Sequence, residues 1–143
     1  MAREGKRLSM PDKPVRVLVV DDHPGFRRAL VSTLSLVNDL EVIGEAGDGE
    51  AGADAALALK PDVVLMDLSM PGISGVESMT RIHRHEPGMP VIILTAHADT
   101  ALEREALTAG AAGFIAKGGG LQELVDSLLD VVRAEEVSRA AGA

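Results

Sequence analysis

Five side chains that could take part in phosphoryl chemistry follow four apolar segments of the chain. They are Asp21 and Asp22 after Val15–Val20, Asp67 after Val63–Met66, Thr95 after Val91–Leu94 and Lys117 after Phe114–Ala116. Short apolar runs are typical of strands that are buried on both faces of a parallel sheet. The carboxyl ends of parallel strands lie at one edge of the sheet, where open α/β folds bind their ligands. We therefore expect these five side chains to meet in one pocket.

The three aspartates of this pocket would repel one another unless positive charge offsets them. Two like charges about 4 Å apart cost about 4 kcal/mol at an effective dielectric constant of about 20. Lys117 can offset one of the three charges, and a divalent cation can offset the rest. An all-oxygen, partly hydrated site suits Mg²⁺ or Mn²⁺ better than zinc. Asp21, Asp22 and Asp67 are therefore predicted metal ligands.

A metal ion, a lysine and a hydroxyl beside a carboxylate are the groups that stabilise a transferring phosphoryl group. Asp67 can itself be the nucleophile and form an aspartyl phosphate, with Lys117 and Thr95 assisting. The small Ala96 leaves space above Asp67, and His97 is expected at the rim of the pocket. The predicted chemistry is phosphoryl transfer onto Asp67.

The segments between the strands are predicted to be helices that position the strand ends. Leu40–Ala46 alternates in polarity and is expected to be a strand at a sheet edge. Five helices are predicted: they begin at Pro24, Ser74 and Thr100 or span Ala51–Leu59 and Leu121–Arg133. Two of them are expected to start with a capping box, Ser74 with Glu77 and Thr100 with Glu103. Strands that alternate with helices favour right-handed parallel crossovers. The predicted fold class is α/β, a flavodoxin-like (βα)5 three-layer sandwich with strand order 2-1-3-4-5.

Length and composition indicate one domain without a nucleic-acid or membrane surface of its own. We expect residues 1–14 to be a flexible basic leader, residues 15–133 the folded domain and residues 134–143 a disordered tail. The net charge of −8 argues against direct binding of nucleic acid or an anionic membrane. No apolar run approaches the roughly 18 residues of a membrane span. The absence of Cys fits a reducing compartment, and we expect a cytoplasmic location.

Four short motifs together carry a resemblance to a known family. They are DD at Asp21–Asp22, MDLSMPG at Met66–Gly72, TA at Thr95–Ala96 and GFIAK at Gly113–Lys117. In this combination the chain resembles, over Val15–Arg133, the receiver domain of two-component response regulators. The stretches DDHPGFRRAL and GAAGFIAKG are most similar to the NarL/FixJ type, whose receivers usually precede a LuxR-type helix-turn-helix domain.

The resemblance implies a role for each site residue. Asp67 would be the phosphoacceptor, and Lys117 would pair with the phosphoryl oxygens. Mg²⁺ would be bound by Asp22, Asp67 and the backbone carbonyl of Ser69, with Asp21 acting partly through water. Thr95 and the aromatic Phe114 would form the switch.

The resemblance also implies partners. The donor would be a phosphohistidine of a sensor histidine kinase, and the domain would catalyse its own phosphorylation and slow dephosphorylation. The output would be transcription through a DNA-binding domain not present in this chain, with a homodimer as a further expected state. The chain is then either part of a longer regulator or a single-domain receiver, and both alternatives stay open.

Other motifs are weaker. The segment Gly47–Gly52 (GDGEAG) fits the dinucleotide-binding pattern in outline, but a turn with Asp48 as the helix N-cap explains it and leaves the strand-end residues their own role. A Mg²⁺-dependent phosphohydrolase would share the nucleophile, but it normally carries a second carboxylate close to that nucleophile, where this chain has Leu68 and Ser69. The four histidines are not expected to form a metal site, and His23 is expected to shape the first loop.

Overall fold

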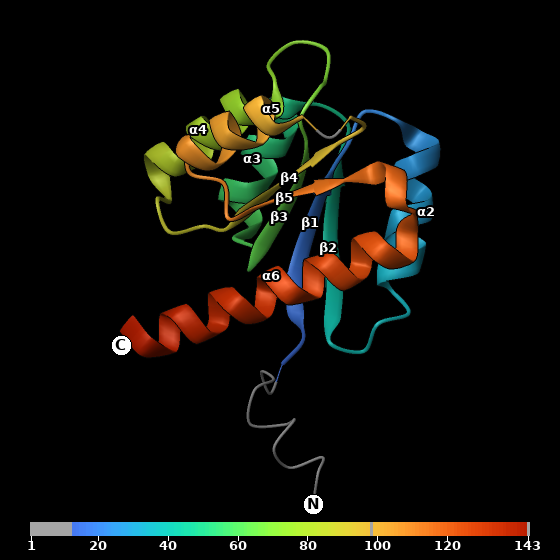
Figure 1. Ribbon diagram of the computed structural model, residues 1–143, viewed down its shortest axis with the longest axis vertical. Helices are drawn as coiled ribbons and strands as arrows, with labels where there is room; N and C mark the ends of the chain where they lie inside the picture. Colours follow the sequence, from blue (N-terminus) through green and yellow to red (C-terminus); the bar gives the residue numbers. More distant parts are fainter. Residues whose placement is uncertain (1–12, 98, 143) are drawn as a thin grey trace, which may run out of the picture.

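Five parallel strands form the central sheet of the protein, which is described by a computed structural model over residues 13–97 and 99–142 (Figure 1). The strands are β1 (Val15–Val20), β2 (Leu40–Ala46), β3 (Val63–Asp67), β4 (Val91–Thr95) and β5 (Gly113–Ala116). Their order is β2-β1-β3-β4-β5, and every neighbouring pair is parallel. The predicted flavodoxin-like (βα)5 fold class and strand order are confirmed. The predicted basic leader lies outside the described residues except for Lys13 and Pro14.

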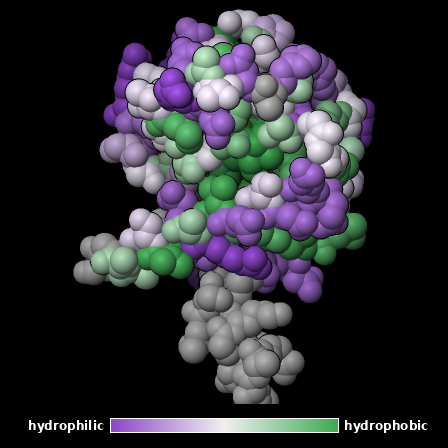
Figure 2. Space-filling view, viewed as in Figure 1, coloured by the Kyte–Doolittle hydropathy of each residue, from purple (hydrophilic) through white to green (hydrophobic). Residues whose placement is uncertain are grey.

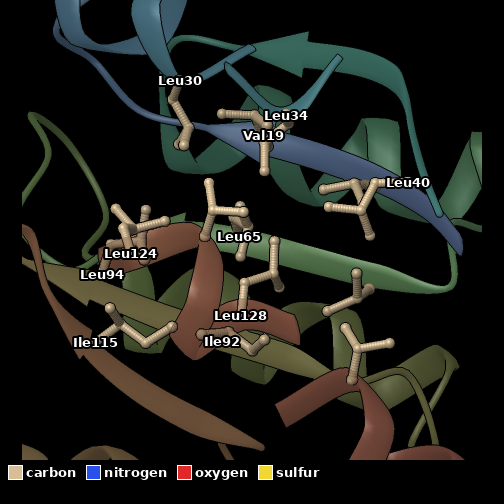
Figure 3. Close-up of a cluster of buried hydrophobic side chains, with 14 of the residues drawn as sticks. Val19, Leu30, Leu34, Leu40, Leu65, Ile92, Leu94, Ile115, Leu124 and Leu128 are labelled. Atoms are coloured by element: carbon tan, nitrogen blue, oxygen red, sulfur yellow. The ribbon is translucent and has the colours of Figure 1, made fainter. Parts of the chain in front are cut away.

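Helices cover both faces of the sheet because successive side chains of a strand point to opposite faces. They are α2 (Pro24–Leu34), α3 (Gly49–Leu59), α4 (Gly75–His85), α5 (Thr100–Thr108) and α6 (Leu121–Gly142), with a short 3₁₀ helix, η1 (Lys117–Gly119), after β5. α2 and α6 cover one face, over a core that includes Leu65 and Leu128 (Figure 1; Figure 3). α3, α4 and α5 cover the other, over a core that includes Met66 and Ile93. β3 and β4 are thus buried throughout, as their continuous apolar runs indicate, while the edge strand β2 is partly exposed.

Two helix starts agree with the sequence pattern. The side chain of Asp48 accepts a hydrogen bond from the N–H of Ala51 at 2.8 Å and caps α3, so the glycine-rich segment before it has an ordinary structural explanation. At α4, Ser74 and Glu77 form the predicted capping box. The loop that leaves β3 is therefore tied to the first turn of α4.

The cap of α5 differs from the prediction. The N-cap residue is Asp99, whose carboxylate accepts hydrogen bonds from the N–H groups of Ala101 and Leu102, and Thr100 is the first helical residue. The predicted capping box of Thr100 with Glu103 is therefore wrong. Aspartate caps as well as threonine or better, and its negative charge is favourable at a helix N-terminus.

The last helix is longer than the apolar pattern indicated. α6 continues through residues 134–142, where the sequence predicted a disordered tail, and it projects beyond the sheet (Figure 1). Most of this segment is exposed and therefore needs no apolar stripe, while its alanine and glutamate residues favour helix by intrinsic propensity. Val137 is 66% exposed there, and green apolar surface is visible on the projecting end in Figure 2. Within the described residues, none of the helices, α6 included, is both long and apolar enough to cross a membrane.

Gly75 lets α4 start directly against the end of β3. Its N–H donates to the carbonyl oxygen of Leu68 at 2.8 Å. A β-carbon at this position would overlap the carbonyl oxygen of Asp67 and press on the backbone of Leu68. Because the obstacle is backbone, it cannot move aside without moving Asp67.

We predict that Gly75→Ala lowers the free energy of unfolding by about 1–3 kcal/mol, the usual cost of overpacking. Urea unfolding measures it. The matched control is Gly25→Ala in α2, where a β-carbon would meet nothing within 4 Å, so stability should stay the same or rise by up to about 1 kcal/mol. Equal stability changes in the two variants would contradict the role assigned to Gly75.

Candidate functional site

The aligned ends of three strands bring the predicted side chains together. Val20 lies beside Met66 in the register of β1 and β3, and Asp67 lies beside Leu94 in the register of β3 and β4. Asp21 is fully buried, and Asp67 and Thr95 are 3% and 4% exposed. Burial of a carboxylate is costly unless it is paired, so these residues must find their partners within the pocket.

Lys117 joins two of the aspartates. Its Nζ lies 2.7 Å from Oδ2 of Asp21 and 3.3 Å from Oδ1 of Asp67, and the lysine side chain is only 12% exposed. The same ammonium also lies 4.4 Å from the centre of the Phe26 ring, within the range of a cation–π interaction. The lysine is therefore held in the pocket by two carboxylates and an aromatic ring.

Two carboxylate oxygens at this edge of the sheet lack a hydrogen-bond partner among the described residues. They are Oδ1 of Asp22 and Oδ2 of Asp67, and both are buried. A buried acceptor left without a partner destabilises the folded state. Ligand atoms of Asp21, Asp22, His23 and Asp67 all lie within 4.8 Å of one another. Unpaired carboxylate oxygens are the donors that a hard divalent cation prefers, so the residues present fit such an ion.

The environment of Asp67 favours its protonated form. Burial, followed by the negative charge of Asp21, raises the pKa of Asp67 from 3.8 to about 6. The Lys117 ammonium acts in the opposite direction but does not cancel these effects. A cation bound beside Asp67 would favour the ionised form, because an opposite charge lowers the pKa of a carboxyl group.

The remaining predicted residues surround this centre. The hydroxyl of Thr95 donates to the carbonyl oxygen of His97 at 3.0 Å and accepts from its N–H at 3.2 Å, so it is engaged in its own turn. Ala96 and His97 are exposed after β4, and Ser69 is exposed two residues beyond Asp67. Ser69, Ala96 and His97 are thus exposed to solvent, while Thr95 is buried at the end of β4.

The two aromatic residues of the chain lie on opposite faces of the sheet. Phe114 is half-buried in β5 and packs against the core beneath α3, α4 and α5. Phe26 packs against the core beneath α2 and α6 and reaches Lys117. Only Phe114 was predicted to serve the site. The role of Phe26 depends on Lys117 reaching from the residue after β5 to the first turn of α2, which no sequence motif specifies.

The first turn of α2 supplies two further groups that the sequence analysis missed. Nδ1 of His23 lies 3.2 Å from Oδ1 of Asp22, 3.3 Å from Oδ1 of Asp21 and 3.9 Å from Oδ2 of Asp67. Arg27 donates to the backbone carbonyl of Asp21 and pairs with Glu45 at 3.1 Å. His23 does shape the first loop, since its N–H donates to Oδ1 of Asp21 at 2.8 Å, and the contacts of its ring with the aspartates come in addition. Its position directly after two aspartates was the signal that could have identified it.

Comparison with known proteins agrees with this geometry. The family described as the response regulator receiver domain matches residues 17–129. The response regulator GacA of Pseudomonas viridiflava is 42% identical over 114 residues, which are 80% of this chain and 53% of GacA. The transcriptional regulatory protein NarL of Mycobacterium tuberculosis is 40% identical over 127 residues, which are 89% of this chain and 58% of NarL. The chain thus spans about half the length of these relatives.

Solved structures show the same similarity in three dimensions. The signal receiver domain of NarL from Mycobacterium tuberculosis has a TM-score of 0.79 at 40% identity, and the match covers 85% of this chain and 98% of that domain. The response regulator domain of CheB from Thermotoga maritima has a TM-score of 0.79 at 34% identity, covering 87% of this chain and 97% of that domain. The similarity therefore extends over nearly all of each solved domain.

The raised pKa of Asp67 predicts a pH-dependent stability. Between pH 3.8 and about 6 the folded protein keeps a proton on Asp67 that the unfolded chain has already released, so the stability of the metal-free protein falls as the pH rises through this range. Asp67→Asn cannot ionise and escapes this loss. At pH 7 without divalent cations, the variant should be more stable than the wild type by about 2–3 kcal/mol.

Urea titrations in the presence of a chelator at several pH values measure this difference. It should shrink as the pH falls from about 6 toward 3.8, because both proteins are then neutral at this position. A stability difference that is the same at both ends of the range would show that Asp67 is not destabilised by ionisation in the folded protein.

Proposed function

The chain belongs to the family of response regulator receiver domains, and on this basis we propose that Asp67 accepts a phosphoryl group from a phosphohistidine of a sensor histidine kinase, in a reaction that depends on Mg²⁺. One observation carries the proposal: Asp67 is buried, with Oδ1 near the Lys117 ammonium and Oδ2 without a hydrogen-bond partner among the described residues. One oxygen thus has a fixed positive partner, and the other is available to a cation or to phosphorus.

Asp22 and Asp67, with the backbone carbonyl of Ser69 and with Asp21 partly through water, would hold Mg²⁺. When bound, the ion supplies positive charge that neutralises the carboxylates and the phosphoryl oxygens. Mn²⁺ would serve the same purpose. Asp21 is already paired with Lys117 at 2.7 Å, which supports an indirect role for it.

The transfer itself needs only the nucleophile and the groups that stabilise charge. A carboxylate oxygen of Asp67 forms a bond to phosphorus, the bond from phosphorus to the imidazole nitrogen of the donor breaks, and its electron pair stays on that nitrogen. Lys117 shifts from the Asp67 carboxylate to the phosphoryl oxygens, within reach of the Phe26 ring that its ammonium already contacts. The domain catalyses its own phosphorylation in this way, and water later hydrolyses the acyl phosphate slowly.

The switch follows from the change of charge. Thr95 leaves its bond to the His97 carbonyl and donates to a phosphoryl oxygen, and Phe114 moves with it. α5 is the element suited to respond, since Ala106 is its one buried residue. A helix with little buried surface can change its position at low energetic cost. The new surface would favour a homodimer or the docking of an output domain.

The output we propose is control of transcription in the cytoplasm, through a DNA-binding domain outside this chain. The support is the similarity to NarL, whose name is that of a transcriptional regulatory protein, and the fact that the chain spans about half of that relative. The net charge of −8 suits a segment that does not contact nucleic acid or a membrane itself.

Labelling tests the phosphoacceptor. Acetyl phosphate with Mg²⁺ should add one phosphoryl group to the wild type, measured by intact mass, and none to Asp67→Asn. Asp62→Asn is the matched control, because Asp62 lies just before the other end of β3 and should leave labelling unchanged. Full labelling of Asp67→Asn would place the acceptor elsewhere, and multiple turnover of a phosphomonoester by the wild type would favour a phosphohydrolase.

A second prediction concerns Lys117. Lys117→Met removes the ammonium that stabilises the phosphoryl oxygens, so labelling should slow by roughly 10²–10³-fold, the usual effect of removing one such donor. Mg²⁺ binding should persist or strengthen, because a repelling positive charge is lost. Parallel mass time courses and Mg²⁺ titrations measure both. Loss of Mg²⁺ binding with normal labelling would reverse the roles assigned here.

A further inference from the structure

We propose that the imidazole of His23 is an additional ligand of the metal site, and that it makes the site bind divalent transition metals such as Mn²⁺ and Co²⁺ in preference to Mg²⁺. The inference rests on the proposed metal site and adds to it a nitrogen donor. It concerns which ions the site selects, whereas the proposed function requires only that a divalent cation binds.

The position of Nδ1 of His23 is that of a shared ligand atom. It lies 3.2 Å from Oδ1 of Asp22 and 3.9 Å from Oδ2 of Asp67, the two buried oxygens without a hydrogen-bond partner among the described residues. Ligand atoms each about 2.1 Å from one ion lie about 3 Å apart at a right angle and about 3.4 Å apart at a tetrahedral angle. The nitrogen therefore needs only a small rotation of its side chain to share an ion with both oxygens.

The imidazole of His23 is not needed to cap the helix that its backbone begins. His23 is the N-cap residue of α2, and its side chain makes no capping hydrogen bond. The N–H of Arg27 donates to the carbonyl oxygen of His23 at 2.9 Å, which fixes the backbone at the edge of the pocket. The side chain is 67% exposed, so the ring contacts the carboxylates and is also open to solvent.

A donor set of carboxylate oxygens and one imidazole differs chemically from an all-oxygen set. Mg²⁺ prefers oxygen and keeps several of its waters, so an added imidazole gains it little. Imidazole is a good ligand for later first-row divalent ions, whose affinities rise in the order Mn²⁺, Fe²⁺, Co²⁺, Ni²⁺. His23 should therefore raise the affinity for these ions and leave that for Mg²⁺ unchanged.

The distances between Nδ1 of His23 and the carboxylate oxygens would also arise if His23 were not a metal ligand. A protonated His23 could act as a counter-ion to the carboxylates and leave when a cation enters. Its removal would then raise the affinity for every divalent cation, because a competitor is lost. Removal of a ligand lowers the affinity for the transition metals alone, so the two arrangements predict opposite results.

The experiment compares His23→Phe with His85→Phe, which changes an exposed histidine at the end of α4 and controls for surface binding. Calorimetric titrations with Mg²⁺, Mn²⁺ and Co²⁺ alone measure the affinities. In His23→Phe the affinity for Co²⁺ should fall by about tenfold or more, since even the loss of a residue that only orients a ligand costs roughly 10–100-fold. Mn²⁺ should show a smaller loss and Mg²⁺ none, and His85→Phe should match the wild type.

A second variant and a spectroscopic measurement guard against the case in which His23→Phe simply misfolds. His23→Asn suits an N-cap position and should show the same preferential loss of Co²⁺. The visible absorption of bound Co²⁺ should change in both His23 variants and not in His85→Phe. An increase or an equal loss for all three ions in the His23 variants would overturn the inference, while unchanged Mg²⁺ binding and labelling would leave the proposed function standing. Absence of divalent binding to the wild type would contradict both.

Discussion

The structure depends on a buried ammonium between two buried carboxylates. Lys117 pairs with Asp21 at 2.7 Å and lies 3.3 Å from Asp67, and all three side chains are largely withdrawn from water. None could be buried alone at an acceptable free energy, because a buried charge needs a partner close by. The ends of β1, β3 and β5 must therefore be level with one another. The tight start of α4 at Gly75 and the first turn of α2 both serve this requirement.

The Lys117 ammonium compensates only part of the negative charge of the three aspartates. Burial and the negative charge of Asp21, which one ammonium does not cancel, raise the pKa of Asp67 to about 6, and one oxygen each of Asp22 and Asp67 lacks a hydrogen-bond partner among the described residues. The same deficit of positive charge that destabilises the metal-free pocket provides the free energy for binding a cation. A site with complete internal pairing would be more stable but would have no oxygen available for a metal or for phosphorus.

The fold and most of the centre could be predicted because their determinants are local in the sequence. Buried runs such as Val63–Met66 define strands, and their carboxyl ends necessarily share an edge. The contacts of His23 and Phe26 could not be predicted in this way, because they depend on how the first turn of α2 is placed over the strand ends. The helix over residues 134–142 was missed because the apolar stripe reports contact with the sheet, while intrinsic propensity acts without it.

Asp67, among three neighbouring aspartates, is the residue that we propose carries the phosphoryl group. Borohydride converts an aspartyl phosphate to homoserine, and peptide sequencing by mass spectrometry then identifies the modified position. After phosphorylation of the wild type and reduction, we expect homoserine at position 67, with aspartate intact at positions 21 and 22. Homoserine at either of those positions, or at none of the three, would contradict it.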